Sequence, residues 1–541
     1  MVVAIRESWN AVKALGRAFS SSYGPGGLDK LIFDREHDVL VVTNDGHAIA
    51  RELKELTRHP VAKALLGVAT RHARSRGDHA KFLVLFASFV LGEVEPLVAD
   101  ELVHPQVAKR ALLKCKARAR EATEGLRRFP TVERRSFKRA FRTALEGKFG
   151  PAVADHLAEV LASAVGSLPP SAFSEPALDL KDWFAFHGRQ GGLVSETEFH
   201  RGRFALGRPP AHPRAPARLR RPVACVTTAK LYAEPPDWAR RAQFQVSGGE
   251  GVETFHSLER DLAKKWAKSV RAAGVDLLLA EKGTSAAFEA ELAARGALVV
   301  RRVKPEVTRA LSKSLGFEVN GDPLRIEPGQ LFQLERAWVE RVPAPGKGGE
   351  LVVWVEGPGA EGGAGGGPGP FGGTFAVRGG TRLVREEVER HLKRALGVAT
   401  KAFGPREGGV VPGSGATDLF VAASLREWAA TLAGKEALVV EAVAGAFEQV
   451  FATLAANVGL DPLDALLEAR SELAHKGPAP VGLAWTPDRG FAVDRAQPDT
   501  AEFFHSRVAA TGAALEFVAQ IVGIDQQVLT NRKVHRDRPE K

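Results

Sequence analysis

Apolar residues recur at helical spacing at both ends of this chain, whereas its middle alternates between strand and helix patterns. The segment 8–20 places apolar side chains on one helical face, namely Trp9, Val12, Leu15 and Phe19. The segment 416–525 is helical again. Helical blocks that enclose an alternating block predict a multidomain α+β fold, and 541 residues suggest about three domains.

The alternating block covers residues 223–340. A strand pattern at 275–279 precedes a helix at 284–295, a second strand follows at 297–300, and Pro305 opens the next helix. This order predicts an α/β domain in the middle of the chain.

Two low-complexity stretches divide the sequence further. Residues 207–222 are rich in proline and predict an extended connector at a domain boundary. Residues 356–373 are dominated by glycine and can bury little surface, so they predict a loop.

The net charge of +11 raises the question of a nucleic-acid partner. The basic residues are scattered along the chain and do not gather in one patch, although they are densest at 117–142 and 213–221. We therefore expect no nucleic-acid partner.

Cysteine content and hydropathy indicate the compartment. The chain has only two cysteines, Cys115 and Cys225, which predict buried thiols in a reducing environment. The most apolar run, residues 82–91, is about half the length that a membrane span needs, so it predicts a buried core helix. We expect a cytoplasmic protein without a membrane span.

Several turn motifs follow one another in a fixed order near the N-terminus. They are SSYGPGGLDKL at 21–31, VVTNDGHAI at 41–49, His59-Pro60, and RSRGDHAKFLVLFA at 74–87. In this order they resemble the equatorial domain of group II chaperonins, which include the thermosome and the cytosolic t-complex chaperonin. The last motif stands where that family has its GDGT phosphate loop.

The resemblance continues in collinear order over nearly the whole chain. Residues 191–202 and 378–396 resemble the intermediate domain, residues 275–283 and 297–316 the apical domain, and residues 408–418 and 454–470 the second equatorial half. The resemblance implies a mainly helical equatorial domain, a small intermediate domain and an α/β apical domain with a helical protrusion at 250–273. The implied bounds are 1–125 and 400–541 (equatorial), 126–205 and 341–399 (intermediate, with the glycine-rich loop), and 206–340 (apical).

The resemblance also implies a site for ATP and magnesium. Asp45 matches the family's carboxylate near the attacking water, Asp78 its magnesium ligand, and Asp494 its carboxylate near the nucleoside. The remaining positions that match nucleotide-binding turns are Gly24, Pro25, Gly26, Asn44, Gly46, Gly77, Gly413 and Gly415.

Four positions depart from the family pattern. His79, Ala80 and Lys81 replace Gly-Thr-Thr, although Lys81 retains a charge that attracts phosphate. Arg394 stands where the family has a catalytic Asp, and arginine stays protonated and cannot act as a base. We therefore predict weakened ATP binding and little or no hydrolysis. The alternative for Arg394 is a simple ion pair with Glu387 or Glu389.

A helical apolar stripe lies within the α/β block. It consists of Phe255, Leu258, Leu262, Trp266 and Val270. Such a stripe is either a core face or a client-binding face, and both interpretations stay open.

Three functional hypotheses follow. The first is a chaperonin-like protein that binds unfolded or partly assembled clients, together with other chaperonin-family subunits. The weakened site, the absence of the family's extra N-terminal strand and the glycine insertion resemble the McKusick–Kaufman and Bardet–Biedl group, which would imply BBSome assembly near the centrosome or basal body. The second is an active ATP-hydrolysing subunit of a hetero-oligomeric folding chaperonin. The third is a purely structural ring subunit.

Overall fold

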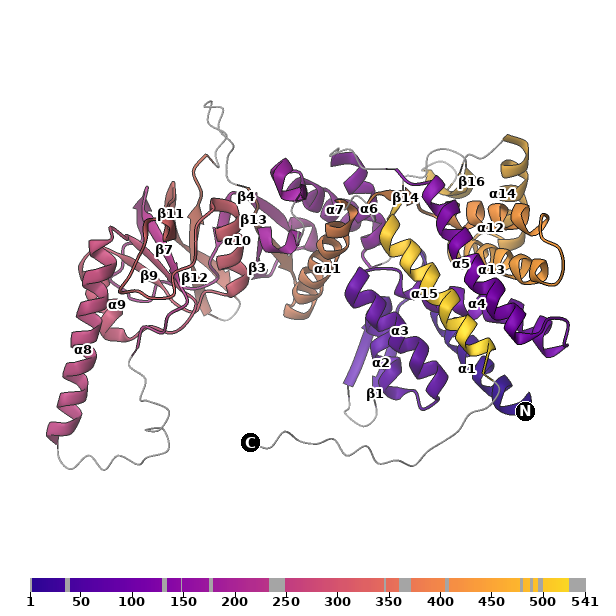
Figure 1. Cartoon of the computed structure of the whole chain (residues 1–541). Helices are drawn as coiled ribbons and strands as arrows, with labels where there is room; N and C mark the ends of the chain where they lie inside the picture. The colour runs from indigo at the N-terminus through magenta and orange to yellow at the C-terminus, as the bar shows by residue number, and fades with distance from the viewer. Residues whose placement is uncertain are drawn as a thin grey trace. The chain divides into compact units, whose positions relative to one another are not determined.

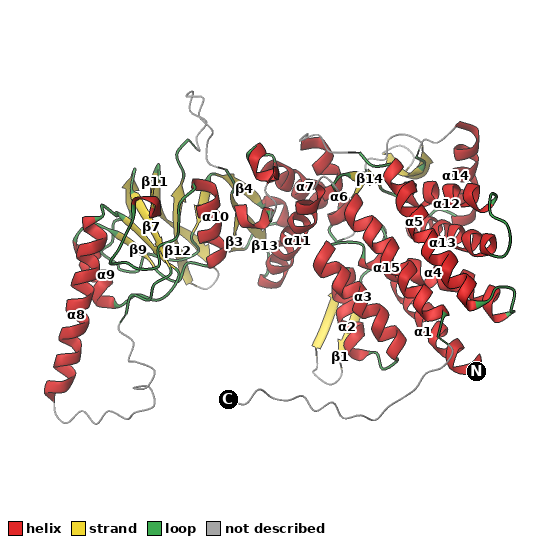
Figure 2. Cartoon of the chain, viewed as in Figure 1, coloured by secondary structure: helices red, strands yellow, loops and turns green. Residues whose placement is uncertain are grey.

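The computed structural model describes residues 2–34, 39–128, 134–146, 148–174, 179–232, 249–344, 347–359, 371–403, 408–476, 480–486, 490–494 and 500–524. The fold is mixed α+β and mostly helical (Figure 2). Two compact units divide the chain. The first unit contains Met1–Thr131, Arg139–Ala154 and Lys401–Lys541, and the second contains Val132–Lys138 and Asp155–Thr400. The finer division into equatorial, intermediate and apical domains stays a prediction.

Helix α4 (Ala80–Ala99) lies at the centre of the first unit (Figure 1). It packs against α1 (Val2–Ser20), α13 (Glu436–Asn457) and α15 (Phe504–Val522), and the same core includes α3 (Pro60–Arg76), α5 (Pro105–Gly125) and α12 (Ala416–Ala429). The predicted stripe of the first helix is confirmed, because Trp9, Val12, Leu15 and Phe19 are all buried.

Among the described residues, two helices, α4 and α13, are long and apolar enough to cross a membrane by length and composition. Most of their residues are buried in the core of the first unit, and the rings of Phe86 and Phe447 pack between them with centroids 4.2 Å apart. They are therefore core helices, as the sequence predicted for residues 82–91. Cys115 and Cys225 are buried free thiols, also as predicted.

Short strands and turns surround this helical core. The antiparallel pair β1 (Lys30–Asp34) and β2 (Val39–Thr43) leads into α2 (Gly46–Leu56). Two further antiparallel pairs are β14 (Val410–Pro412) with β17 (Ala501–Phe503), and β15 (Gly482–Thr486) with β16 (Gly490–Asp494). Asp461 caps α14 (Pro462–Lys476), because its Oδ1 accepts from the backbone N–H groups of Leu463 and Asp464. Helices α6 (Arg134–Glu146) and α7 (Pro151–Val165) are each divided between the two units.

The described residues of the second unit form three sheets. The first has the order β10-β7-β8-β9, and the predicted strand–helix alternation is confirmed there by β8 (Leu277–Ala280), α9 (Ala286–Ala294), β9 (Leu298–Val300) and α10 (Pro305–Leu315). Side chains of α8 (Gly249–Ala272) and α9 cover one face of this sheet, and those of α10 cover the other. The remaining strands of this sheet are β7 (Val223–Thr227) and β10 (Leu331–Gln333).

The other two sheets have the orders β5-β12-β11-β6 and β3-β13-β4. Helix α11 (Arg382–Thr400) contacts β3 and β13 of the latter. The strand bounds are β3 (Phe184–Gln190), β4 (Glu198–Arg201), β5 (Arg203–Ala205), β6 (Arg218–Arg220), β11 (Arg336–Ala344), β12 (Lys347–Glu356) and β13 (Gly373–Gly379).

The two low-complexity stretches both lie in the second unit. Within the proline-rich connector, Arg218–Arg220 forms β6 and pairs with β11. Both flanks of this connector belong to the same compact unit. Of the glycine-rich stretch, residues 360–370 lie outside the described residues, and its ends join β12 to β13.

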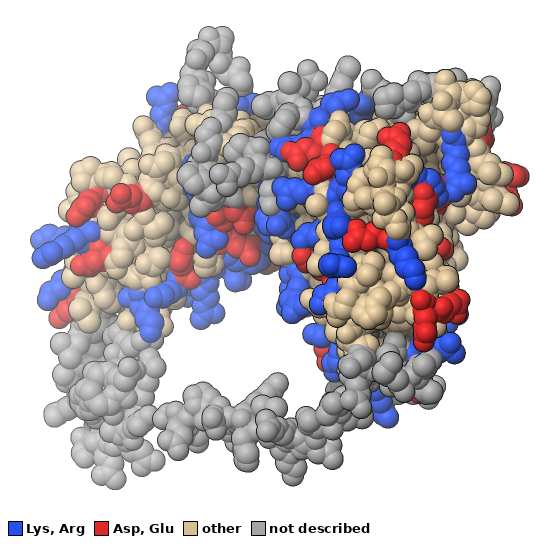
Figure 3. Space-filling view, turned by 45° about the vertical axis from the view of Figure 1, so that its right-hand side comes forward, with Lys and Arg blue, Asp and Glu red and all other residues tan. Residues whose placement is uncertain are grey.

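Charged side chains of both signs are interspersed on the face drawn in Figure 3, where Lys and Arg alternate with acidic and uncharged residues. This distribution is consistent with the scattered basic residues of the sequence.

Candidate functional site

The turns that the sequence analysis singled out come together in the first unit. Lys81, in the first turn of α4, donates from Nζ to the carbonyl oxygen of Ser22 at 2.5 Å and to Oδ1 of Asn44 at 2.7 Å. Asn44 in turn donates from Nδ2 to the carbonyl oxygen of Gly27 at 2.7 Å. We name the turns at 22–27, 44–46, 77–81 and 413–418 the cradle.

Leu454 of α13 lies against two glycine turns of the cradle. Gly24 has φ +83° and Gly415 has φ +79°, and a Cβ on either residue would approach Leu454, at 2.5 Å and 3.4 Å respectively. A Cβ on Gly26 would lie 2.1 Å from the backbone oxygen of Asn457. The glycines on both sides of Pro25 therefore allow close packing against α13 within the protein itself.

Asp45 is the N-cap of α2. Its carboxylate accepts from the backbone N–H groups of His47 and Ala48, at 3.4 Å and 3.3 Å, and its own N–H donates to Oγ1 of Thr43 at 3.0 Å. Asp45 is buried and caps α2, and this structural role is independent of any catalytic role. A Cβ on the adjacent Gly46 would lie 2.6 Å from Cγ of Lys81, so only glycine leaves room for this lysine.

Gly77 and Asp78 form the turn between α3 and α4. Gly77 has φ +85° and closes α3 through a hydrogen bond from its N–H to the oxygen of Ala73. Burial alone would raise the pKa of Asp78, but the charges of His79 and Lys148 and the N–H of His79 together lower it. Asp78 is therefore ionised at neutral pH, as a magnesium ligand must be.

The side chain of His79 forms hydrogen bonds within the protein. It has a left-handed backbone with φ 67° at the N-cap of α4 and is buried. Its Nδ1 lies 3.0 Å from Oγ of Ser506, and its Nε2 lies 3.0 Å from Oε2 of Glu502. Glycine is the residue that adopts such a φ without strain, so the buried side chain of His79 stands on a backbone conformation that favours glycine.

Behind His79 lies a buried ion network that the sequence analysis missed. Arg507 of α15 is 1% exposed, pairs with Asp418 of α12, and lies 3.5 Å from Glu502 through Nη1. Its guanidinium also lies over the ring of Phe82, 3.7 Å from the centroid. The available signal was a single arginine among the apolar residues of a helical segment, which requires a buried partner.

Burial and neighbouring charges shift the pKa values of the two acids of this network in opposite directions. Burial raises the pKa of Asp418 to about 6, against the opposing charge of Arg507. Burial also raises the pKa of Glu502, but Arg507 and His79 outweigh it and the net direction is downward. Tyr23 of the first turn belongs to the same neighbourhood, since burial and then the charge of Asp418 raise its pKa well above its usual value.

The later glycine turn completes the cradle. A Cβ on Gly413 would lie 3.0 Å from Oγ1 of Thr500, and Ser414 between the two glycines shares a 2.5 Å hydrogen bond with the same hydroxyl. Asp494 lies on β16 opposite Gly482 of β15. The next residue of β15 donates from its N–H to the oxygen of Ser414, so the β15–β16 hairpin places Asp494 beside this turn.

Arg394 lies on α11 in the second unit, whereas the other predicted nucleotide-site residues belong to the first unit. The two acids suggested as its partners have other contacts. Glu389 pairs with Lys393 at 3.0 Å, and Glu387 lies 3.6 Å from His391.

The apolar stripe of α8 is partly a core face. Val270 is fully buried, and the ring of Trp266 packs edge-on against Phe288 with centroids 6.2 Å apart. Leu262 is 39% exposed. The side chains of Phe255 and Leu258 lie outside the described residues.

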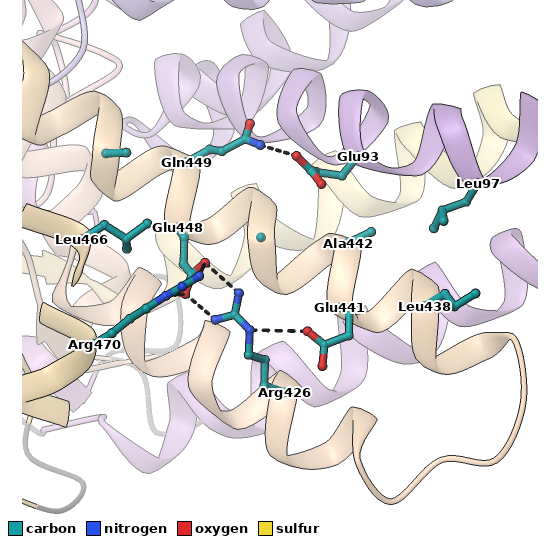
Figure 4. Close-up of a pocket in the computed structure, with 12 residues that line it drawn as sticks. Glu93, Leu97, Arg426, Leu438, Glu441, Ala442, Glu448, Gln449, Leu466 and Arg470 are labelled. Atoms are coloured by element: carbon teal, nitrogen blue, oxygen red, sulfur yellow. Dashed lines mark hydrogen bonds and ion pairs between the residues drawn. The ribbon is translucent and has the colours of Figure 1, made fainter. Parts of the chain in front are cut away.

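A separate polar cluster lies between α4, α12, α13 and α14 (Figure 4). Arg426 and Arg470 both reach the buried carboxylate of Glu448, with Nη2 of Arg426 2.7 Å from Oε2 and Nε of Arg470 2.8 Å from Oε1. None of the predicted site residues lines this pocket. The cluster ties three helices together and does not belong to the cradle.

The cradle fits magnesium ATP only in part. The glycine turns, Asp45 and Asp78 belong to the cradle, but the nitrogens of His79 and Lys81 already bond to protein groups on Glu502, Ser506, Ser22 and Asn44. Among the described residues, no group of three His, Cys, Asp or Glu side chains is arranged to hold a metal ion.

Comparison with known proteins identifies the family. Residues 15–532 match the TCP-1/cpn60 chaperonin family. A thermosome subunit beta from Archaeoglobus fulgidus is 31% identical over 517 residues, which cover 95% of this chain and 90% of the relative. A thermosome subunit beta from Sulfurisphaera tokodaii is 28% identical over 531 residues, covering 98% and 92%. The chain belongs to the TCP-1/cpn60 chaperonin family and is a distant relative of archaeal thermosome subunits.

Proposed function

We propose that this chain is a chaperonin-like protein that binds unfolded or partly assembled client proteins, with weakened ATP binding and impaired hydrolysis. Family membership gives it a role in protein folding, and chaperonin subunits typically oligomerise and bind clients. The proposal adds the loss of the ATPase cycle and a holding or assembly function in its place.

One observation carries the proposal. Lys81 and His79, the two residues that depart most from the phosphate loop, are engaged in hydrogen bonds that connect four segments of the first unit. A phosphate that entered the cradle would compete with these contacts, since Lys81 already directs two of its three donors to protein oxygens. Arg394, in place of the family's Asp, removes a general base that contributes about 10²–10⁴ in rate.

ATP hydrolysis by the purified chain, measured beside Arg394→Asp, tests this proposal. We expect no turnover by the unmodified chain. A gain in the variant would make Arg394 the main lesion, and silence in both would assign the loss to residues 77–81. Turnover by the unmodified chain that disappears in Asp45→Ala would instead support the active folding-subunit hypothesis and contradict ours.

Client binding provides the second test, with the α8 stripe as the proposed surface. Leu262 is the described member that stays exposed, so Leu262→Ser should weaken capture of a chemically unfolded protein without ATP. Leu351→Ser, at an equally exposed leucine on β12, is the matched control. An equal effect of both substitutions would contradict a specific client surface on α8, and no ATP-independent capture at all would favour a purely structural subunit.

The reported relatives are thermosome subunits, and they give no support to a ciliary role. The proposal therefore stops at client binding and complex assembly, without BBSome assembly.

A further inference from the structure

We infer that a cationic cavity on the second unit binds an acidic segment of a partner protein. The cavity has a volume of about 470 Å³ and lies between α8, α9 and the proline-rich connector. Its basic lining residues come from the connector and from α8, and they are His212, Arg214, Arg260 and Lys264. Glu291 is the one acid among its described lining residues, and it pairs with Arg295 at 3.4 Å. This inference does not depend on the proposed client-binding function.

Helix α8 presents two of these cations on one flank. Arg260 and Lys264 are one turn apart, so their side chains project from the same side of the helix. The buried stripe of α8, which includes Ala263 and Ala267, separates this flank from Leu262. Successive residues are rotated by about 100° around a helix, so Leu262 projects from the other side of the stripe. The cavity is therefore separate from the exposed leucine that we propose for client capture.

Helix α9 supplies a floor of short side chains. Besides Glu291, its lining residues are all alanines, namely Ala287, Ala290, Ala293 and Ala294. The larger apolar side chains of this helix, Phe288 and Leu292, are fully buried in the core beneath it. The floor therefore leaves room for a peptide backbone to lie close to the cations.

These positive charges have few counter-charges within the protein. The side chains of Arg214 and Arg260 form no hydrogen bond or ion pair in the part of the chain that the structure describes. Lys264 lies 4.0 Å from Asp261, at the distance limit of an ion pair. Carboxylates from another protein would therefore meet donors that are not already engaged, and they would offset the repulsion among the cations.

A fixed turn holds the connector residues beside the helices. Nδ1 of His212 accepts from the backbone N–H of Arg214 at 3.2 Å, and the N–H of Ala215 donates to the oxygen of His212 at 3.1 Å. The N–H of Ala211 donates to the oxygen of Val299 at 2.8 Å, which anchors the turn to β9. Because Nδ1 is an acceptor, the neutral imidazole of His212 carries its proton on Nε2 and adds a further donor.

The lining favours an acidic protein segment over a nucleic acid. Guanidinium groups form paired hydrogen bonds with carboxylates as well as with phosphates. Sites for single-stranded nucleic acids add aromatic side chains on which the bases stack. No Phe, Tyr or Trp is among the described residues that line this cavity. A run of Asp or Glu side chains uses the cations and needs no stacking surface, so it is the class of partner that fits.

Fluorescence anisotropy of a fluorescein-labelled hexaglutamate peptide, titrated with the full chain, tests the site. We expect saturable binding that Arg260→Gln weakens by about five-fold or more. Arg214→Gln, on a different segment, should weaken it to a similar degree. Lys265→Gln is the matched control, because Lys265 is exposed on the same helix, carries the same charge and is not part of the cavity lining. It should leave the affinity unchanged.

Four outcomes would overturn the inference. The first two are the absence of saturable binding and equal losses in Arg260→Gln and Lys265→Gln. The third is a hexauridylate that binds more tightly than the peptide and is weakened by Arg260→Gln, which would make the partner a nucleic acid. The fourth is an equal loss of peptide binding in Leu262→Ser, which would place the peptide on the client surface.

Discussion

Nε2 of His79 lies 3.0 Å from Oε2 of Glu502, a residue 423 positions later in the chain. This contact joins the N-terminus of the central helix α4 to the strand that precedes α15. It makes the turn between α3 and α4 part of the buried framework of the first unit.

Glu502→Gln should destabilise the chain, because it removes the carboxylate that faces both His79 and Arg507. Breaking a buried ion pair costs about 3–5 kcal/mol, and the free energy of unfolding in urea should fall by a similar amount. Glu516→Gln is the control, since Glu516 forms a half-exposed pair with Lys116 that is worth about 0–1 kcal/mol. Equal losses in the two variants would contradict a special role for the His79–Glu502 contact.

The stability contribution of Lys81 should depend on pH. Burial, and then the charge of Lys148, lower the pKa of Lys81 to about 8. Between that pKa and the unfolded value near 10.4, the unfolded chain binds the proton and the folded chain does not, so stability rises with pH. We therefore expect the unfolding free energy of the wild type, relative to Lys81→Met, to increase by about 2–3 kcal/mol from pH 8 to pH 10.5. A flat difference over this range would show that Lys81 is not desolvated.

Two substitutions at Asp45 separate its capping role from catalysis. Asp45→Ala removes the cap of α2 and should lower the unfolding free energy by about 1 kcal/mol. Asn is also a good N-cap residue, so Asp45→Asn should retain most of the stability. If the chain hydrolyses ATP at all, both variants should lose that activity, because an amide cannot replace the carboxylate. Activity that followed stability across the two variants would assign Asp45 a purely structural role.

Alanine substitutions at two glycines with positive φ separate the free-energy cost of a steric clash from that of the backbone conformation. Gly434→Ala should cost about 1–2 kcal/mol, because its φ is +90° but no atom lies within 4 Å of the added Cβ. Gly415→Ala should cost about 1–3 kcal/mol more, since its Cβ would lie 2.6 Å from Cδ2 of Phe451. Thermal unfolding of both variants measures the difference, and equal costs would mean that α13 yields to the added methyl group.

The Glu448 cluster in Figure 4 should lose more stability when its shared carboxylate is removed than when one of its two arginines is removed. Arg470→Met leaves Glu448 paired with Arg426 and should cost about 1–2 kcal/mol. Glu448→Leu leaves both guanidiniums, which are partly exposed, without their shared carboxylate. We expect this variant to lose more stability in urea than Arg470→Met, and the reverse order would contradict the shared clamp.

The sequence by itself determined the type and position of several elements. Regular apolar spacing located α1, α4 and the strand–helix alternation of the second unit, because burial follows a periodicity that neighbouring residues report. The ordered turns at 21–31, 41–49 and 74–87 also pointed to the family that the comparisons identified. The sequence did not show which distant positions contact each other, because apolar spacing carries no information on which segments meet.

Only the tertiary structure decided what the altered phosphate loop does. Lys81 was expected as a charge available to phosphate, yet its Nζ is bonded to Ser22 and Asn44. The sequence shows His79 only as a departure from the family pattern, whereas the structure gives it a buried contact with Glu502. Arg507 lies in a helix whose apolar pattern gave it no role. Such roles depend on burial and on partners hundreds of residues away, which exist only once the helices have packed.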